Sequence, residues 1–114
     1  MHLDSQLYGN VLVVTACDPR LDAAVAVQFK DKLRELAEDG PDRVILDLSK
    51  VDFLDSSGLG AVVASMKILG VERNLELAGL TPTVAKVFRL TRMDTIFTIH
   101  TSMAQALDSY ANAS

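Results

Sequence analysis

A pair of serines stands between a strand-like segment and a stretch with helical spacing. Residues 44–48 read Val-Ile-Leu-Asp-Leu, a short apolar run rich in β-branched residues that is typical of a buried strand. Residues 55–60 read Asp-Ser-Ser-Gly-Leu-Gly, and a helical pattern of apolar residues follows. Hydroxyls at such a junction lie at a helix N-terminus, where unpaired N–H groups and the helix dipole favour an anion. Ser56 and Ser57 are therefore candidates to gain or bind a negatively charged group.

The same residues also fit two other interpretations. Asp and Ser are the commonest helix caps, so Asp55 to Gly58 also fits a turn followed by a cap and nothing more. Ser56 or Ser57 could also be the nucleophile of a hydrolase. Against this, the sequence has no Gly-x-Ser-x-Gly elbow, no P-loop lysine and no histidine paired with a nucleophile. We therefore expect no catalytic residue and no enzyme activity.

Metal binding is not expected from the spacing of the potential ligands. His2 and His100 each lack a second ligand at the spacing of known metal sites. Cys17 is the single cysteine, so it cannot form an internal disulfide, which fits a reducing cytoplasm. We expect Cys17 to be a small buried apolar residue. The sequence thus predicts neither a metal site nor a cofactor.

The composition is that of an ordinary globular domain. The chain has 114 residues, 49% of them hydrophobic and 23% charged, which suits one domain over 1–114. Its formal net charge of -4 argues against nucleic acid as a partner, because phosphate binding needs a basic surface. No apolar run approaches the roughly 20 residues of a membrane-spanning helix, and residues 1–5 do not resemble a signal peptide. We expect a cytoplasmic monomer without a membrane or nucleic-acid partner.

Strand and helix signals alternate along the chain. The sequence predicts strands at 3–8, 11–16, 43–49, 75–78 and 95–99. It predicts helices at 23–38 and 57–69, a third from 81 onward and a fourth from 102 onward. Gly9-Asn10 is expected to turn the first two strands into a hairpin. The order ββαβαβαβα predicts an α/β fold with a mixed sheet.

Several residues are expected to begin or end these helices. Asp22 and Thr81 are predicted caps, and Ser102 with Gln105 fits a capping box. Gly70 is expected to end the second helix. The predicted apolar face of the last helix comprises Met103, Ala106, Leu107 and Tyr110.

The run from Val44 to Gly60 resembles the signature of the anti-sigma factor antagonists, bacterial regulators built on a STAS domain. The Asp-Ser-Ser-Gly-Leu-Gly block at 55–60 is its most specific part. The likeness extends to Arg20-Leu21-Asp22, to 75–80 and to 97–102. The resemblance implies an α/β fold with a STAS-like mixed sheet of about five strands and about four helices.

The resemblance also implies a partner switch. The unphosphorylated protein binds a serine kinase that doubles as an anti-sigma factor, and sigma is released. The kinase uses ATP to phosphorylate one serine and end the complex, and a metal-dependent serine phosphatase of the PP2C type reverses this. The phosphorylated serine follows the Asp of the motif and maps onto Ser56. The implied partner-binding residues are Asp22, Asp55, Ser56, Ser57, Gly58, Leu59 and Gly60.

Two further points concern the partner surface. Glycines cost helix stability, so Gly58 and Gly60 are expected to leave the first helical turn without bulk for an approaching partner. The loop at 17–20 has no glycine, and it carries Arg20 where the family often has an acidic residue.

An alternative function is a ligand-sensing module of another signalling complex, in which the Ser56 loop holds a nucleotide or a small anion.

Overall fold

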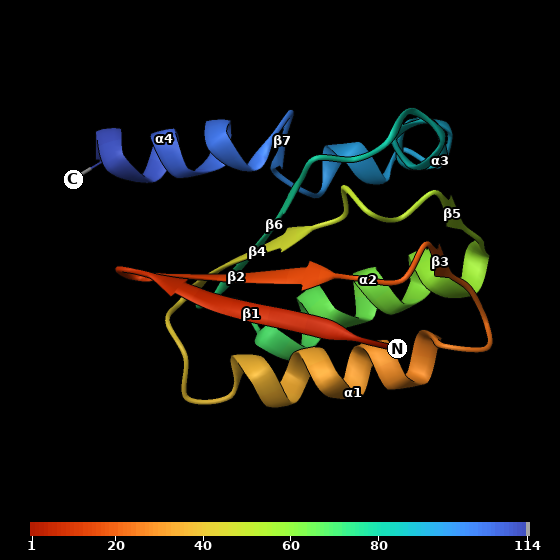
Figure 1. Ribbon diagram of the computed structural model, residues 1–114, viewed down its shortest axis with the longest axis horizontal. Helices are drawn as coiled ribbons and strands as arrows, with labels where there is room; N and C mark the ends of the chain where they lie inside the picture. The colour runs from red at the N-terminus through yellow and green to blue at the C-terminus, as the bar shows by residue number, and fades with distance from the viewer. Residues whose placement is uncertain (114) are drawn as a thin grey trace.

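Five strands form one mixed sheet at the centre of the protein (Figure 1). The computed structural model describes the backbone of residues 1–113 and the side chains of residues 1–108. The strand order is β1-β2-β4-β6-β7, with β1 antiparallel to β2 and the other neighbours parallel. The strands are β1 (Leu3–Tyr8), β2 (Val11–Ala16), β4 (Arg43–Asp47), β6 (Asn74–Ala78) and β7 (Ile99–His100).

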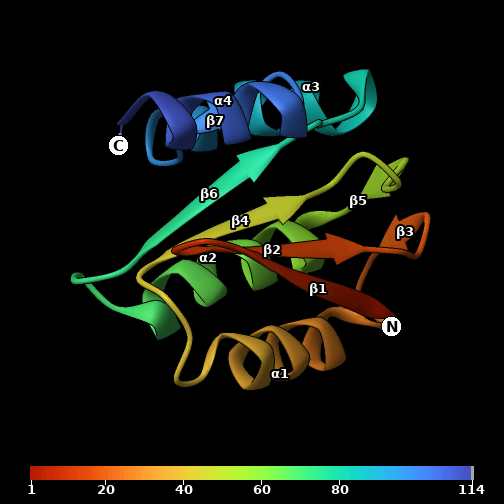
Figure 2. The same cartoon turned by 60° about the vertical axis from the view of Figure 1, so that its left-hand side comes forward.

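Four α-helices pack around this sheet (Figure 2). They are α1 (Ala26–Ala37), α2 (Ser56–Leu69), α3 (Pro82–Leu90) and α4 (Met103–Ala113), with a short 3-10 helix η1 (Met93–Thr95) after α3. Side chains of α1, α2 and α3 share one apolar core with one face of the sheet, and α4 covers the other face. The mixed sheet with four helices confirms the predicted STAS-like fold class.

Alternation along the central strands explains the two layers. In β2, Leu12 and Val14 face the core shared with α1 and α2, whereas Val11 and Val13 face α4. Strand β4 lies between two parallel neighbours and is buried on both faces, as its apolar run predicted. On α4, Met103, Ala106 and Leu107 pack against this second layer, while the side chain of Tyr110 lies outside the described residues.

The hairpin, the four helices and four of the five strands lie close to where the sequence predicted them, but the expected strand at 95–99 is wrong. Residues 93–95 form η1, which follows a left-handed residue, Arg92 (φ 60°). The strand itself is only Ile99–His100. Phe97 packs edge-to-face on Phe88, with the ring centroids 6.0 Å apart. Of the apolar residues in this stretch, Phe97 is therefore a core aromatic in an irregular segment and not part of a strand.

The start of the first helix also differs from the prediction. α1 begins at Ala26, and its N-cap, Val25, makes no side-chain capping bond. Asp22 instead accepts a hydrogen bond from the backbone of Ala24 (3.1 Å), so it stabilises a turn before the helix. Thr81 is the N-cap of α3, but its hydroxyl donates to the Val51 carbonyl (2.9 Å) and fastens two loops together.

Candidate functional site

The loop that carries the serines is held by a second, very short parallel sheet that the sequence did not predict. β3 (Arg20–Leu21) pairs with β5 (Phe53–Leu54). The Pro19 carbonyl accepts hydrogen bonds from the backbone N–H groups of Asp52 (2.8 Å) and Phe53 (3.2 Å). These bonds attach residues 52–54 to the segment that follows β2. The loops after β2 and β4 therefore meet beyond the carboxyl ends of these two strands, and α2 starts there.

Asp55 joins the beginnings of two helical segments. It is the N-cap of α2, and its Oδ1 accepts the backbone N–H of Gly58 at 2.9 Å. Its Oδ2 accepts the backbone N–H of Ala23, in the turn before α1, at 3.3 Å. The Asp55 carboxylate therefore has a structural role on both sides of the site.

Ser56 and Ser57 are the first two residues of α2, and both are exposed. Within the described part of the chain, neither hydroxyl has a hydrogen-bond partner. The fold therefore does not use these hydroxyls, although the residues on either side of them are fixed by the Asp55 cap. This is the combination of exposure and rigid backbone that a modifying enzyme or a binding partner can use.

The two motif glycines have different surroundings. Gly58 is buried, and a Cβ added there would lie 2.0 Å from the Leu21 carbonyl oxygen. The expectation that Gly58 leaves room for a partner is therefore wrong, because the protein's own β3 backbone occupies that space. Gly60 is exposed, and a Cβ there would meet nothing within 4 Å. Leu59 is half-buried and packs against the main core, so it presents only part of its side chain.

A shallow groove of about 350 Å³ runs between the N-terminal halves of α1 and α2. Most of its lining residues are small, and Ser57 and Gly60 belong to them. Val27, on its α1 side, is 63% exposed. The lining residues are Ala23, Ala26, Val27, Lys30, Ser57, Gly60, Ala61 and Ala64. A floor of small side chains lets another backbone approach closely, so this groove is suited to docking a protein segment.

Arg20 neutralises Asp22 in the neighbouring loop. The Nε atom of Arg20 lies 3.3 Å from Asp22 Oδ2, and its guanidinium lies 4.1 Å from the centre of the Phe53 ring. The carboxylate of Asp22 thus already has an intramolecular partner as well as its turn hydrogen bond. Of the predicted partner-binding residues, Ser56, Ser57 and Gly60 are the most open, and Asp22, Asp55 and Gly58 serve the fold.

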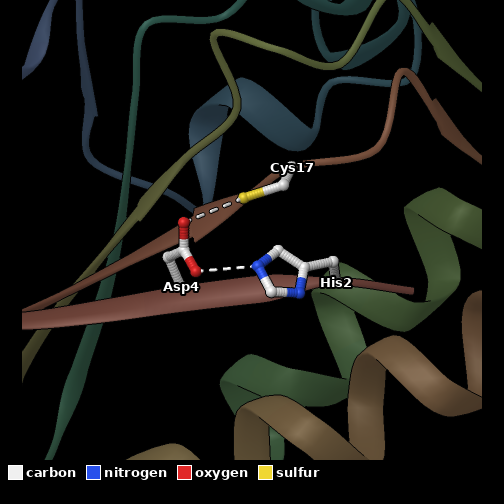
Figure 3. Close-up of side chains that lie close together, drawn as sticks. All are labelled: His2, Asp4 and Cys17. Atoms are coloured by element: carbon white, nitrogen blue, oxygen red, sulfur yellow. Dashed lines mark hydrogen bonds and ion pairs between the residues drawn. The ribbon is translucent and has the colours of Figure 1, made fainter.

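A second polar cluster was missed by the sequence analysis and lies at the open end of the β1–β2 hairpin (Figure 3). His2 Nε2 lies 2.8 Å from Asp4 Oδ1, and the Cys17 thiol donates to Asp4 Oδ2 at 3.4 Å. Cys17 is half-buried and its thiol donates a hydrogen bond, so the expectation of a small buried apolar residue is wrong. Partial burial and the Asp4 carboxylate raise the pKa of the Cys17 thiol. The hydrogen bonds from the Cys17 thiol and from His2 lower the pKa of Asp4.

A third cluster lies between the sheet and α4. Glu76 receives two hydrogen bonds from Arg43 (2.6 and 2.8 Å) and one contact from His100 Nε2 (2.7 Å). Arg43 also donates to the Ala106 carbonyl of α4 at 3.3 Å. Burial raises the pKa of Glu76, but the hydrogen bonds from Arg43 and His100 outweigh it, and the pKa lies below its usual value. This cluster is a buried ion pair that holds α4 on the sheet.

Comparison with known proteins identifies relatives of this chain. A family model described as STAS domain matches residues 2–106. The chain is 32% identical over 94 residues to BtrV of Bordetella bronchiseptica, which is named as an anti-sigma factor antagonist, covering 82% of this chain and 81% of that protein. An anti-sigma factor antagonist from Mycobacterium paratuberculosis superimposes with a TM-score of 0.84 at 25% identity, covering 95% of this chain and 92% of that one.

The same fold occurs in SpoIIAA of Bacillus, whose structure is known in two states. The unphosphorylated form gives a TM-score of 0.77 at 23% identity, with 97% of each chain covered. The phosphorylated form gives 0.69 at 22% identity, with 96% of this chain and 99% of that chain covered. No helix in the described part of this chain is long and apolar enough to cross a membrane.

Proposed function

This chain belongs to the STAS domain family of anti-sigma factor antagonists, and we propose that Ser56 is the phosphorylation site of its partner switch. The unphosphorylated protein binds an anti-sigma factor that is also a serine kinase, and sigma is released. The kinase transfers the γ-phosphoryl group of ATP to the Ser56 hydroxyl, with ADP as the leaving group, and the complex dissociates. A PP2C-type phosphatase hydrolyses the phosphate, and the cycle takes place in the cytoplasm.

The observation that carries this proposal is the contrast between Ser56 and its neighbours. The Ser56 hydroxyl is exposed and unused at the first position of α2, whereas Asp55 and Gly58 beside it hold the fold together. A phosphate there lies at the positive end of the helix dipole, near backbone N–H groups, which favours an anion. Phosphorylation therefore leaves the domain folded and changes only the surface that it presents.

The added charge is sufficient to end a complex. A phosphate adds about -1.5 to -2 charges at pH 7. It stands next to Asp55 and near the exposed Asp52, so a partner surface that fits the unmodified loop meets an excess of negative charge. Weakening a complex from about nanomolar to about micromolar requires roughly 4 kcal/mol. Burying one mispaired dianion costs at least that much.

The groove between α1 and α2 is the proposed docking surface next to the switch. Ser57 and Gly60 line it directly, and Ser56 precedes Ser57 at the same helix end. Val27 offers an exposed apolar contact on the other wall. The relatives do not favour the alternative of a ligand-sensing module, because those named here are anti-sigma factor antagonists.

The proposal is tested with the anti-sigma kinase of the same organism and matched serine variants. Native protein, Ser56→Ala and Ser57→Ala are each bound to the kinase, ATP is added, and phosphopeptides are mapped by mass spectrometry. We expect phosphate on Ser56 in the native and Ser57→Ala proteins, and a Ser56→Ala complex that ATP does not dissociate. Phosphate on Ser57 with Ser56 unmodified, or ATP-driven release of Ser56→Ala at the native rate, would refute it.

A further inference from the structure

Three side chains with different metal-binding atoms converge at the open end of the β1–β2 hairpin. They are the imidazole of His2, the carboxylate of Asp4 and the thiol of Cys17 (Figure 3). One ligand atom from each lies within 4.8 Å of the other two. We propose that these three residues form a binding site for a divalent zinc ion. This site goes beyond the partner switch and does not depend on it.

The pairing of the two strands fixes the three ligands relative to one another. His2 and Asp4 are two residues apart on an extended segment, so their side chains point to the same face. The ladder pairs Asp4 with Thr15 and Leu3 with Ala16, and the Cys17 N–H donates to the His2 carbonyl at 3.0 Å. Cys17 therefore lies opposite His2. The ligands come from a hydrogen-bonded ladder, not from a loose loop.

The donor set and its dimensions suit zinc. Zinc takes nitrogen, sulfur and oxygen ligands in a tetrahedron, at about 2.0–2.1 Å, about 2.3 Å and about 2.0–2.2 Å respectively. In such a tetrahedron neighbouring donors stand roughly 3.3–3.7 Å apart. Here the distances are 2.8 Å from His2 Nε2 to Asp4 Oδ1 and 3.4 Å from Cys17 Sγ to Asp4 Oδ2. Small rotations of these three side chains bring all three donors to one ion.

Binding replaces the present hydrogen bonds with metal–ligand bonds. The Cys17 thiol loses its proton to solvent as the zinc–sulfur bond forms, and His2 binds as neutral imidazole through Nε2. Asp4 contributes one carboxylate oxygen. Three protein ligands leave a fourth position for water or for a group of a partner protein. Lys50 is the nearby cation whose charge opposes that of the ion; it adds to the lowering of the pKa of Asp4 and only partly offsets the rise in the pKa of Cys17.

The position of the site gives it a physical connection to the rest of the protein. Cys17 directly follows β2 and lies two residues before Pro19, whose carbonyl holds the segment that leads to Ser56. A zinc ion on His2, Asp4 and Cys17 fastens the start of β1 to the end of β2 beside that anchor. The expected consequence is a more stable hairpin end and a higher melting temperature in the presence of zinc.

The test is a titration of the full chain, made without a histidine tag and kept reduced with a phosphine. Cobalt serves as a spectroscopic probe, because tetrahedral cobalt shows visible bands and cobalt–thiolate bonds show an ultraviolet charge-transfer band. We expect one equivalent of cobalt to give both signals and zinc to displace it. Calorimetry with zinc alone then gives the affinity.

Ligand variants and a matched control decide the assignment. Cys17→Ser, His2→Asn and Asp4→Asn are each expected to weaken zinc binding at least tenfold, and Cys17→Ser loses the charge-transfer band. His100→Asn is the control, because His100 is the other histidine and lies in the Glu76 cluster. Native protein without a cobalt–thiolate band, Cys17→Ser with native affinity, or His100→Asn with the larger loss would each overturn the proposal. Circular dichroism confirms that every variant is folded.

Discussion

Replacing Gly58 by alanine is expected to destabilise the protein, although alanine is the better helix former. A Cβ at this position would lie 2.0 Å from the Leu21 carbonyl oxygen, far inside the roughly 3.5 Å of a favourable contact. The N-terminus of α2 must therefore move away from β3. That movement disturbs the Asp55 cap, whose Oδ1 accepts the Gly58 N–H at 2.9 Å, and the hydrogen bond from Asp55 N to Leu21 O at 3.4 Å.

The magnitude follows from three opposing effects. Forcing extra bulk into a packed site costs about 1–3 kcal/mol, and weakening a helix cap costs about 1 kcal/mol. The change from glycine to alanine within a helix returns about 1 kcal/mol. The net loss for Gly58→Ala is then about 1–3 kcal/mol, which lowers the melting temperature by about 4–12 °C in a domain of this size.

Gly60→Ala provides the matched control two residues further along the same helix. A Cβ at Gly60 meets nothing within 4 Å, so only the helix-propensity gain remains. We expect a stabilisation of about 0.5–1 kcal/mol. Urea and thermal unfolding followed by circular dichroism measure both variants. Effects of the same sign at the two positions, or a Gly58→Ala protein as stable as the native one, would refute the reasoning.

Two further predictions concern polar residues. Glu76→Gln should lower the free energy of unfolding at neutral pH by about 1–3 kcal/mol, because Arg43 and His100 lose a charged partner. The pKa of Glu76 is depressed in the fold, so its stabilisation is present above pH 4.5 and is lost as the pH falls further. Urea midpoints of native protein and variant should therefore converge below pH 4.5, and a constant gap would contradict this. Asp55→Ala should cost about 1–2 kcal/mol and Asp55→Asn less, since Asn retains a capping oxygen, and equal losses in urea unfolding would exclude the capping role.

The elements that the sequence predicted best are those with a long periodic pattern. Strand β4 and helix α2 each repeat their apolar spacing over several residues, and the hairpin carries Gly9-Asn10 at its turn. β3 and β5 have only two residues each, so no periodicity exists to detect. Their pairing depends on backbone hydrogen bonds from a distant loop to Pro19.

The candidate site likewise has features that the sequence predicts and features that depend on contacts between distant segments. The exposed position of Ser56 at the start of α2 follows from the motif alone, whereas the burial of Gly58 depends on the path of β3. The cluster of His2, Asp4 and Cys17 could have been found from the predicted hairpin. Extending its register by one residue beyond the pair of Leu3 and Ala16 places Cys17 opposite His2. Spacing along the sequence conceals this contact because the ligands come from two strands.

The most direct test of the partner switch compares one protein in two chemical states. The anti-sigma kinase is titrated by calorimetry with unphosphorylated protein and with protein phosphorylated only on Ser56, while circular dichroism monitors the fold. We predict an affinity loss of about 1,000-fold, equivalent to about 4 kcal/mol, with an unchanged spectrum and melting curve. Equal affinity of the two forms, or unfolding of the phosphorylated one, would contradict the proposal that Ser56 switches the surface and not the fold.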